Sequence, residues 1–116
     1  MKITDVSVKV YAVPQAASRP VTRNWIFVRI DTDEGLYGYG EATTEYIGQA
    51  VVAAIMEDFR PRLIGEDPTR IQFIWHKLQR LTWWRGGIVQ SSAMSGIDHA
   101  LWDITGKAYG QPVYKL

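Results

Sequence analysis

Apolar and polar residues alternate along the start of the chain. Val6, Val8 and Val10 fall on alternate positions, which is the spacing of a strand exposed on one face. This run predicts a strand over residues 3–13, which Pro14 ends.

A second β-rich run, "NWIFVRID", ends at Asp31 and is followed by a tight polar turn around Gly35. A third strand then passes through Tyr37 and Tyr39. The intervening segment 14–23 has two prolines and no apolar period, so it predicts a loop longer than a hairpin needs. Together the three runs predict an antiparallel meander.

From Ile47 onward the apolar spacing changes to every fourth residue, which predicts a helix. Hydroxyl and acidic side chains suit a helix N-terminus, so the start is expected near Thr44 or Glu45. Pro61 and Gly65 are expected to end this helix.

Two further helices follow. Asp67 with Pro68 is a start signal for the second helix, and a third is expected over 89–109, closed by Gly110 and Pro112. The second helix has an apolar stripe formed by Ile71, Ile74, Trp75, Leu78 and Leu81. The predicted fold class is therefore α+β, with a three-stranded antiparallel meander followed by three helices packed on one face.

Composition narrows the classes of function. The 116 residues are 47% hydrophobic, which suits one compact domain, and the net charge of +1 without blocks of like charge argues against nucleic-acid binding. No apolar run is long enough to cross a membrane. The absence of cysteine suits a reducing compartment, so a cytoplasmic location is expected.

The stretch "SGIDHALWDITGK" holds the most conspicuous polar residues of the chain. On a helix, Asp98 and Asp103 point in different directions and cannot share a proton or a metal ion. His99 and Asp103 are four apart, but two ligands do not make a metal site. Asp103 also lies four residues before Lys107, the favourable order for a surface ion pair, so a structural role is predicted.

Other motifs are equally weak as catalytic signals. "GYG" lacks the third glycine of a dinucleotide-binding loop, because Thr43 stands at that position, and its glycines are better explained by strand packing. The chain has no acid cluster at ligand spacing, no nucleophile elbow and no phosphate loop. We therefore predict no catalytic residue and no metal ligand in this chain.

"WWRGG" before the third helix has two interpretations. Its aromatic rings and guanidinium could receive a carboxylate or a sugar face. Alternatively, Trp83 and Trp84 fill the core while Arg85 caps carbonyl groups at the end of the preceding helix, and this structural interpretation is favoured.

The stretch "AMSGIDHALWDITGKAYGQPVYKL" resembles the signature of the mandelate racemase and muconate lactonizing branch of the enolase superfamily. "DTDEGLYGYGEA" and "LIGEDPTRIQFIWHKL" are similar to that family's second hairpin and second helix. "RGG" is similar to galactonate dehydratases and "RNW" to mannonate dehydratases. The resemblance implies an N-terminal capping domain over residues 1–110, with residues 111–116 beginning the linker into a (β/α) barrel.

In such enzymes the barrel carries three acidic ligands for Mg²⁺ and the Lys or His bases. The resemblance thus implies a sugar-acid dehydratase that removes the proton next to a carboxylate and expels the 3-hydroxyl, with the catalytic barrel absent from this chain. It also implies a homo-oligomer in the intact enzyme. A racemase or cycloisomerase of the same branch is the alternative.

The resemblance also implies where the cap meets its substrate. Two family loops that close over the substrate correspond to residues 14–24 and 43–47. On that basis Asn24 is expected to hydrogen-bond a hydroxyl or carboxylate group. The expected pocket-wall residues are Trp25, Thr44 and Tyr46, with Arg85 as a polar neighbour.

A rival interpretation belongs to another class of protein. The chain could act by itself as a binding or dimerisation module without chemistry of its own. Such a module would need a partner to cover the apolar surface that a cap presents to its barrel.

Overall fold

The computed structural model describes residues 1–12, 24–81, 83 and 85–116, and within them a three-stranded sheet carries the fold. Strands β1 (Ile3–Ala12), β2 (Asn24–Thr32) and β3 (Tyr37–Glu41) pair antiparallel in the order β1-β2-β3. The predicted meander is confirmed. The loop expected over residues 14–23 lies outside the described residues.

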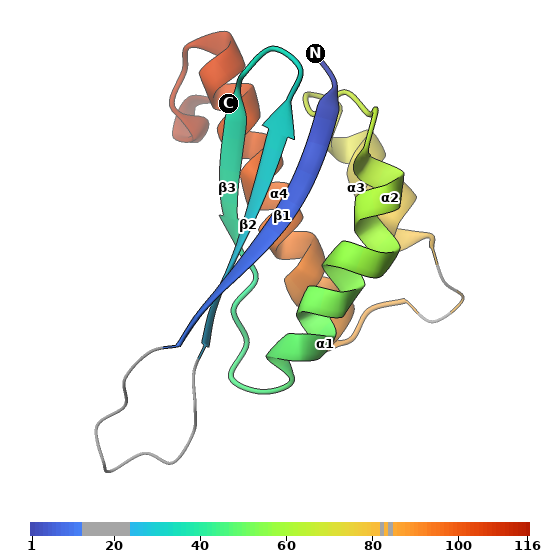
Figure 1. The fold of residues 1–116 in the computed structure, drawn as a ribbon. Helices are drawn as coiled ribbons and strands as arrows, with labels where there is room; N and C mark the ends of the chain where they lie inside the picture. The colour runs from blue at the N-terminus through green and yellow to red at the C-terminus, as the bar shows by residue number, and fades with distance from the viewer. Residues whose placement is uncertain (13–23, 82, 84) are drawn as a thin grey trace.

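The first helical segment is a continuous rod of three parts (Figure 1). It consists of α1 (Gly48–Ala53), a π-helical turn η1 (Ala54–Phe59) and α2 (Arg60–Leu63). The predicted start near Thr44 or Glu45 is wrong, because the Thr44 hydroxyl donates a hydrogen bond to the Tyr46 carbonyl and closes a turn there instead.

Pro61 does not end this rod, contrary to prediction. It stands in the first turn of α2, where a missing N–H is tolerated. The helical path instead ends at Leu63, shortly before Gly65, whose φ of 85° takes the chain into the left-handed region.

Helix α3 (Ile71–Gln79) begins later than its sequence signal indicated. The Asp67 carboxylate accepts hydrogen bonds from the Thr69 N–H at 3.0 Å and from the Thr69 hydroxyl at 2.8 Å, so it closes a turn before the helix. Of the predicted stripe, Ile71, Ile74 and Leu78 are buried, whereas Trp75 is exposed.

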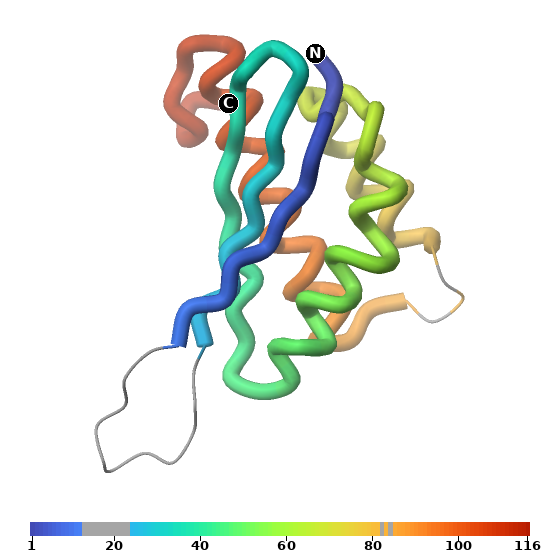
Figure 2. Tube along the Cα trace, in the orientation of Figure 1, coloured from blue at the N-terminus to red at the C-terminus, as the bar shows by residue number. Residues whose placement is uncertain are grey.

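Helix α4 (Ile88–Tyr109) confirms the predicted third helix, and Gly110 closes it with φ 61°. A short 3₁₀ turn, η2 (Val113–Lys115), follows Pro112. Figure 2 shows α4 running behind the sheet, from the end near α1 to the end where β2 turns into β3. Among the described residues, no helix is both long and apolar enough to cross a membrane.

The core lies between the sheet and the helices. Along β2 the side chains of Ile26, Val28 and Ile30 are buried, and the residues between them are not. The helices therefore cover one face of the sheet, which confirms the predicted fold class. Helix α4 contributes Ile97, Ala100, Leu101 and Ile104 to this core. Ala108, near the C-terminal end of α4, is exposed.

Two glycines of β3 set the distance between the sheet and α4. A Cβ atom at Gly40 would lie 1.8 Å from the carbonyl oxygen of Gly96, and one at Gly38 would lie 2.1 Å from that of Ala100. Any side chain there would push the two backbones apart. The "GYG" motif therefore serves close packing, as predicted.

Candidate functional site

The segment that follows β3 lies against the start of β2. The Ala42 N–H donates to the Ile26 carbonyl at 2.8 Å, and the Ile26 N–H donates to the Thr43 hydroxyl at 3.1 Å. Asn24 begins β2, opposite Ala12. The start of β2 and the segment that follows β3 lie at the same end of the sheet (Figure 1). The structure thus brings Asn24 and the segment 43–47 to one end of the sheet.

Thr44 and Tyr46 have different positions in this segment. Thr44 is 8% exposed and its hydroxyl is bonded to the Tyr46 carbonyl, so it holds the turn and presents no free hydroxyl to a ligand. Tyr46 is 62% exposed. Tyr46 therefore presents the exposed side chain of this turn, and Thr44 holds the turn in place.

Ile47 was missed by sequence reasoning. It has φ 55° and ψ 29°, a left-handed conformation that β-branched residues rarely adopt, and it is the N-cap of α1. Its side chain is exposed beside Tyr46. No sequence signal could have found it, since an isoleucine normally argues against this conformation.

Trp25 does not share a wall with Asn24. The two residues are consecutive on a strand, so their side chains point to opposite faces, and Trp25 is on the face without helices. Its ring stacks on that of Phe27 with 5.8 Å between centroids, and Tyr11 meets Phe27 edge-on at 5.9 Å. Trp25 therefore belongs to an aromatic cluster on the open face of the sheet.

Arg85 is exposed just before α4. Within the described part of the chain its guanidinium forms no hydrogen bond or ion pair, so the carbonyl capping favoured from sequence is not observed. Trp83 is fully exposed, which contradicts its predicted place in the core, and Trp84 lies outside the described residues. Gly86 and Gly87, with φ of 90° and 84°, shape this connection.

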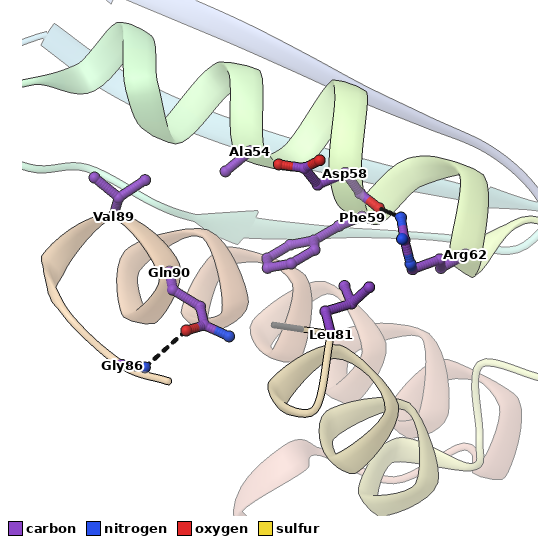
Figure 3. Close-up of a pocket in the computed structure, with 8 residues that line it drawn as sticks. All are labelled: Ala54, Asp58, Phe59, Arg62, Leu81, Gly86, Val89 and Gln90. Carbon is purple, nitrogen blue, oxygen red and sulfur yellow. Dashed lines mark hydrogen bonds between the residues drawn. The ribbon is translucent and has the colours of Figure 1, made fainter. Parts of the chain in front are cut away.

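A hollow of about 360 Å³ lies beside Arg85, between the η1–α2 part of the rod and the start of α4 (Figure 3). The Phe59 ring points into it, and the Gln90 side chain accepts a hydrogen bond from the Gly86 N–H at 2.7 Å. The full lining is Ala54, Asp58, Phe59, Arg62, Leu81, Gly86, Val89 and Gln90. None of the five predicted site residues is in this lining, so the hollow is separate from the end that carries Asn24 and Tyr46.

The two aspartates of α4 have different surroundings. Asp103 accepts hydrogen bonds from the Tyr39 N–H at 3.0 Å and from Lys107 at 2.8 Å, and Lys107 also donates to the Tyr37 carbonyl at 2.7 Å. This confirms the structural role predicted for Asp103 and shows that it ties α4 to the edge of β3.

Asp98 is half-buried. Burial raises the pKa of its carboxyl group above the ordinary value, while nearby His99 and a hydrogen bond from the Trp102 side chain oppose that rise. Among the described residues, no group of three or more histidines, aspartates and glutamates is arranged to hold a metal ion.

The sequence of this chain matches a known protein family. The sequence pattern of the "Mandelate racemase / muconate lactonizing enzyme, N-terminal domain" family matches residues 1–116. The chain belongs to this family. The expected membership in the enolase superfamily is thereby confirmed.

The relatives of this N-terminal domain are longer proteins. It is 48% identical, over all 116 residues, to a D-galactonate dehydratase of Verminephrobacter eiseniae and 46% identical to one of Pectobacterium atrosepticum. The chain spans 28% of the length of each.

Solved structures agree with these sequence matches. A crystal structure of an enolase from Pantoea ananatis with bound D-gluconate and Mg is 43% identical, with a TM-score of 0.86 over 98% of this chain and 26% of that one. A member of the enolase superfamily from Polaromonas is 33% identical, with a TM-score of 0.87 over 99% of this chain and 32% of the other. The N-terminal domain thus accounts for about a quarter to a third of each matched protein.

Proposed function

We propose that this N-terminal domain is the substrate-selecting cap of a Mg²⁺-dependent sugar-acid dehydratase. The enzyme would remove the proton next to the substrate carboxylate and expel the 3-hydroxyl, giving a 2-keto-3-deoxy acid and water. The proposal is supported by relatives named D-galactonate dehydratase that are 46–48% identical over the whole chain, and by a similar structure that holds D-gluconate and Mg.

Mg²⁺, when bound, would stabilise the negative charge that develops on the substrate carboxylate. We assign the ion and the catalytic bases to a barrel domain outside this chain, because the chain spans only 28% of the length of its D-galactonate dehydratase relatives. What this chain would supply is selection of the substrate and exclusion of water from the reacting carbon.

The observation that carries the proposal is the meeting of two segments at one end of the sheet. The Asn24 amide can both donate to and accept from sugar hydroxyls, and the exposed Tyr46 adds an aromatic face and a phenol group. Trp25 would border this end from the opposite face of the sheet, and Arg85 would be a more distant polar neighbour. Thr44 would act only by positioning Tyr46.

We propose that the barrel packs against the C-terminal end of α4 and the residues that follow it. Trp102, Val113 and Leu116 line a shallow apolar hollow of about 340 Å³ together with His99, and Tyr114 beside it is 85% exposed. An apolar surface of this kind marks a contact with another body. We further propose that the intact enzyme is a cytoplasmic homo-oligomer, in keeping with the absence of cysteine.

The test is turnover of D-galactonate and D-gluconate by the intact protein that carries this chain, assayed as formation of the 2-keto-3-deoxy acid with Mg²⁺ present. Asn24→Ala should lower kcat/KM by about tenfold or more, because a buried hydroxyl would lose its hydrogen-bond partner. Gln72→Ala, which removes an exposed amide on α3, is the matched control and should leave turnover unchanged.

Two results would overturn the proposal. If the intact protein dehydrates neither acid, the substrate class is wrong. If Asn24→Ala and Gln72→Ala behave alike on an accepted substrate, this end of the cap does not contact the substrate.

A further inference from the structure

The face of the sheet without helices carries an unusual density of aromatic side chains. We call it the open face. Its aromatic members are Tyr11, Trp25, Phe27, Tyr37 and Tyr39, and its charged members are Asp5, Lys9, Arg29, Asp31 and Glu41. The residues Tyr11, Trp25, Tyr37 and Tyr39 are between 41% and 53% exposed. Tyrosine, tryptophan and arginine are the residues that contribute most to binding energy in protein interfaces.

These side chains already contact one another in the free chain. The Arg29 guanidinium lies 4.2 Å from the centroid of the Tyr37 ring and donates a hydrogen bond to the Tyr39 hydroxyl at 3.0 Å. It also forms an ion pair with Asp31 at 2.6 Å. A partner that binds here would therefore restrict few additional side-chain rotations, which favours association.

The unpaired charges of this face form a simple pattern. Asp5 is paired with Arg60 at 2.9 Å and Arg29 with Asp31, whereas Lys9 and Glu41 have no partner within the described part of the chain. The register places Lys9 directly opposite Phe27 on β1, and Glu41 directly opposite Phe27 on β3. Two opposite charges thus flank Phe27, one strand spacing to either side, roughly 10 Å apart.

We propose that the open face binds the open face of a second copy of this chain, about a two-fold axis that lies between the two faces, parallel to β2 and over Phe27. Such an axis places β1 of one copy over β3 of the other. Lys9 of each copy therefore faces Glu41 of the other copy, which gives two such pairs. Phe27 lies against Phe27 at the centre, and the strands align as in packed sheets. The near balance of charges on the face disfavours a polyanionic partner such as nucleic acid.

This inference rests on the homo-oligomer in the proposed function, and not on the dehydration reaction. Its test is cross-linking in the intact protein, with any cysteine outside this cysteine-free chain replaced. Differently tagged copies carrying Lys9→Cys and Glu41→Cys are co-expressed and treated with a short bis-maleimide. We expect several-fold more cross-linked dimer from the mixed copies than from either variant alone. Gln72→Cys mixed with Glu41→Cys is the control and should give none.

Charge reversal gives a second, independent readout by sedimentation. Lys9→Glu should weaken this dimer contact by about tenfold or more, since it sets like charges against each other twice. The double swap Lys9→Glu with Glu41→Lys should restore it. An oligomer with no preference for the mixed cross-link, and no rescue by the swap, would overturn the proposed face. A monomeric intact protein would overturn both this inference and the proposed oligomer.

Discussion

The contact between α4 and β3 and the end of the sheet where β1 stops and β2 begins are built in opposite ways. At the first, Gly38 and Gly40 let two backbones touch, and Asp103 and Lys107 bond the strand edge. At the second, Tyr11, Trp25 and Tyr46 are exposed. This domain thus fixes its fold along α4 and exposes aromatic side chains at the opposite end of the sheet.

The largest effect is expected from adding a side chain where the backbones touch. Gly40→Ala would place a Cβ atom 1.8 Å from the Gly96 carbonyl oxygen, so α4 must move, at a cost of about 3 kcal/mol in the free energy of unfolding. Denaturant unfolding measures this.

Gly35→Ala is the matched control for that substitution. Gly35 has φ 79° but open space around its Cβ position, so only backbone strain of about 1 kcal/mol is expected. Equal losses for the two variants would mean that the close approach of β3 and α4 does not determine stability.

A smaller loss is expected from Asp103→Ala. It removes the acceptor of the Tyr39 N–H and the partner of Lys107, but the side chain is about a third exposed, so about 1 kcal/mol is expected, seen as a lower Tm. Asp103→Asn keeps an acceptor for the Tyr39 N–H and should lose less. An unchanged Tm for Asp103→Ala would contradict the structural role of this residue.

The smallest effect concerns Asp98, on the side of α4 away from this contact. Burial raises the pKa of Asp98 in the folded state, so the folded state holds this proton more tightly than the unfolded state does. The free energy of unfolding therefore falls as the pH rises from the pKa of the unfolded state through that of the folded state, and it stays at the lower value at higher pH. Asp98→Asn should therefore raise the Tm of this chain slightly at pH 7 and leave it unchanged at pH 3. A lower Tm at pH 7 would show that the ionised carboxylate stabilises the fold.

Sequence patterns predicted the elements of this fold better than their ends. The alternation in β1 and β2 and the glycine that closes α4 depend on local periodicity and on backbone conformation, which a sequence displays directly. The starts of α1 and α3 were predicted too early, because Thr44 and Asp67 use their side chains to close turns instead of capping helices. Both uses employ the same residue types, so the sequence alone does not separate them.

At the candidate site, too, the sequence predicted some features and not others. The family resemblance predicted that residues 14–24 and 43–47 close over the substrate, and of these the structure places Asn24 and the segment 43–47 at one end of the sheet. The opposite facing of Asn24 and Trp25 follows from strand alternation and could have been predicted. The left-handed Ile47 and the exposed Trp83 could not, since each depends on contacts made by the folded chain.

A crystal structure of the intact protein that carries this chain, with D-galactonate or D-gluconate bound, would show directly whether the cap contacts the substrate. We expect the side chains of Asn24 and Tyr46 to lie within hydrogen-bond distance of the sugar acid, with a barrel domain packed against Trp102 and Tyr114. A bound sugar acid that touches no residue of this chain would contradict the proposed role as a substrate-selecting cap.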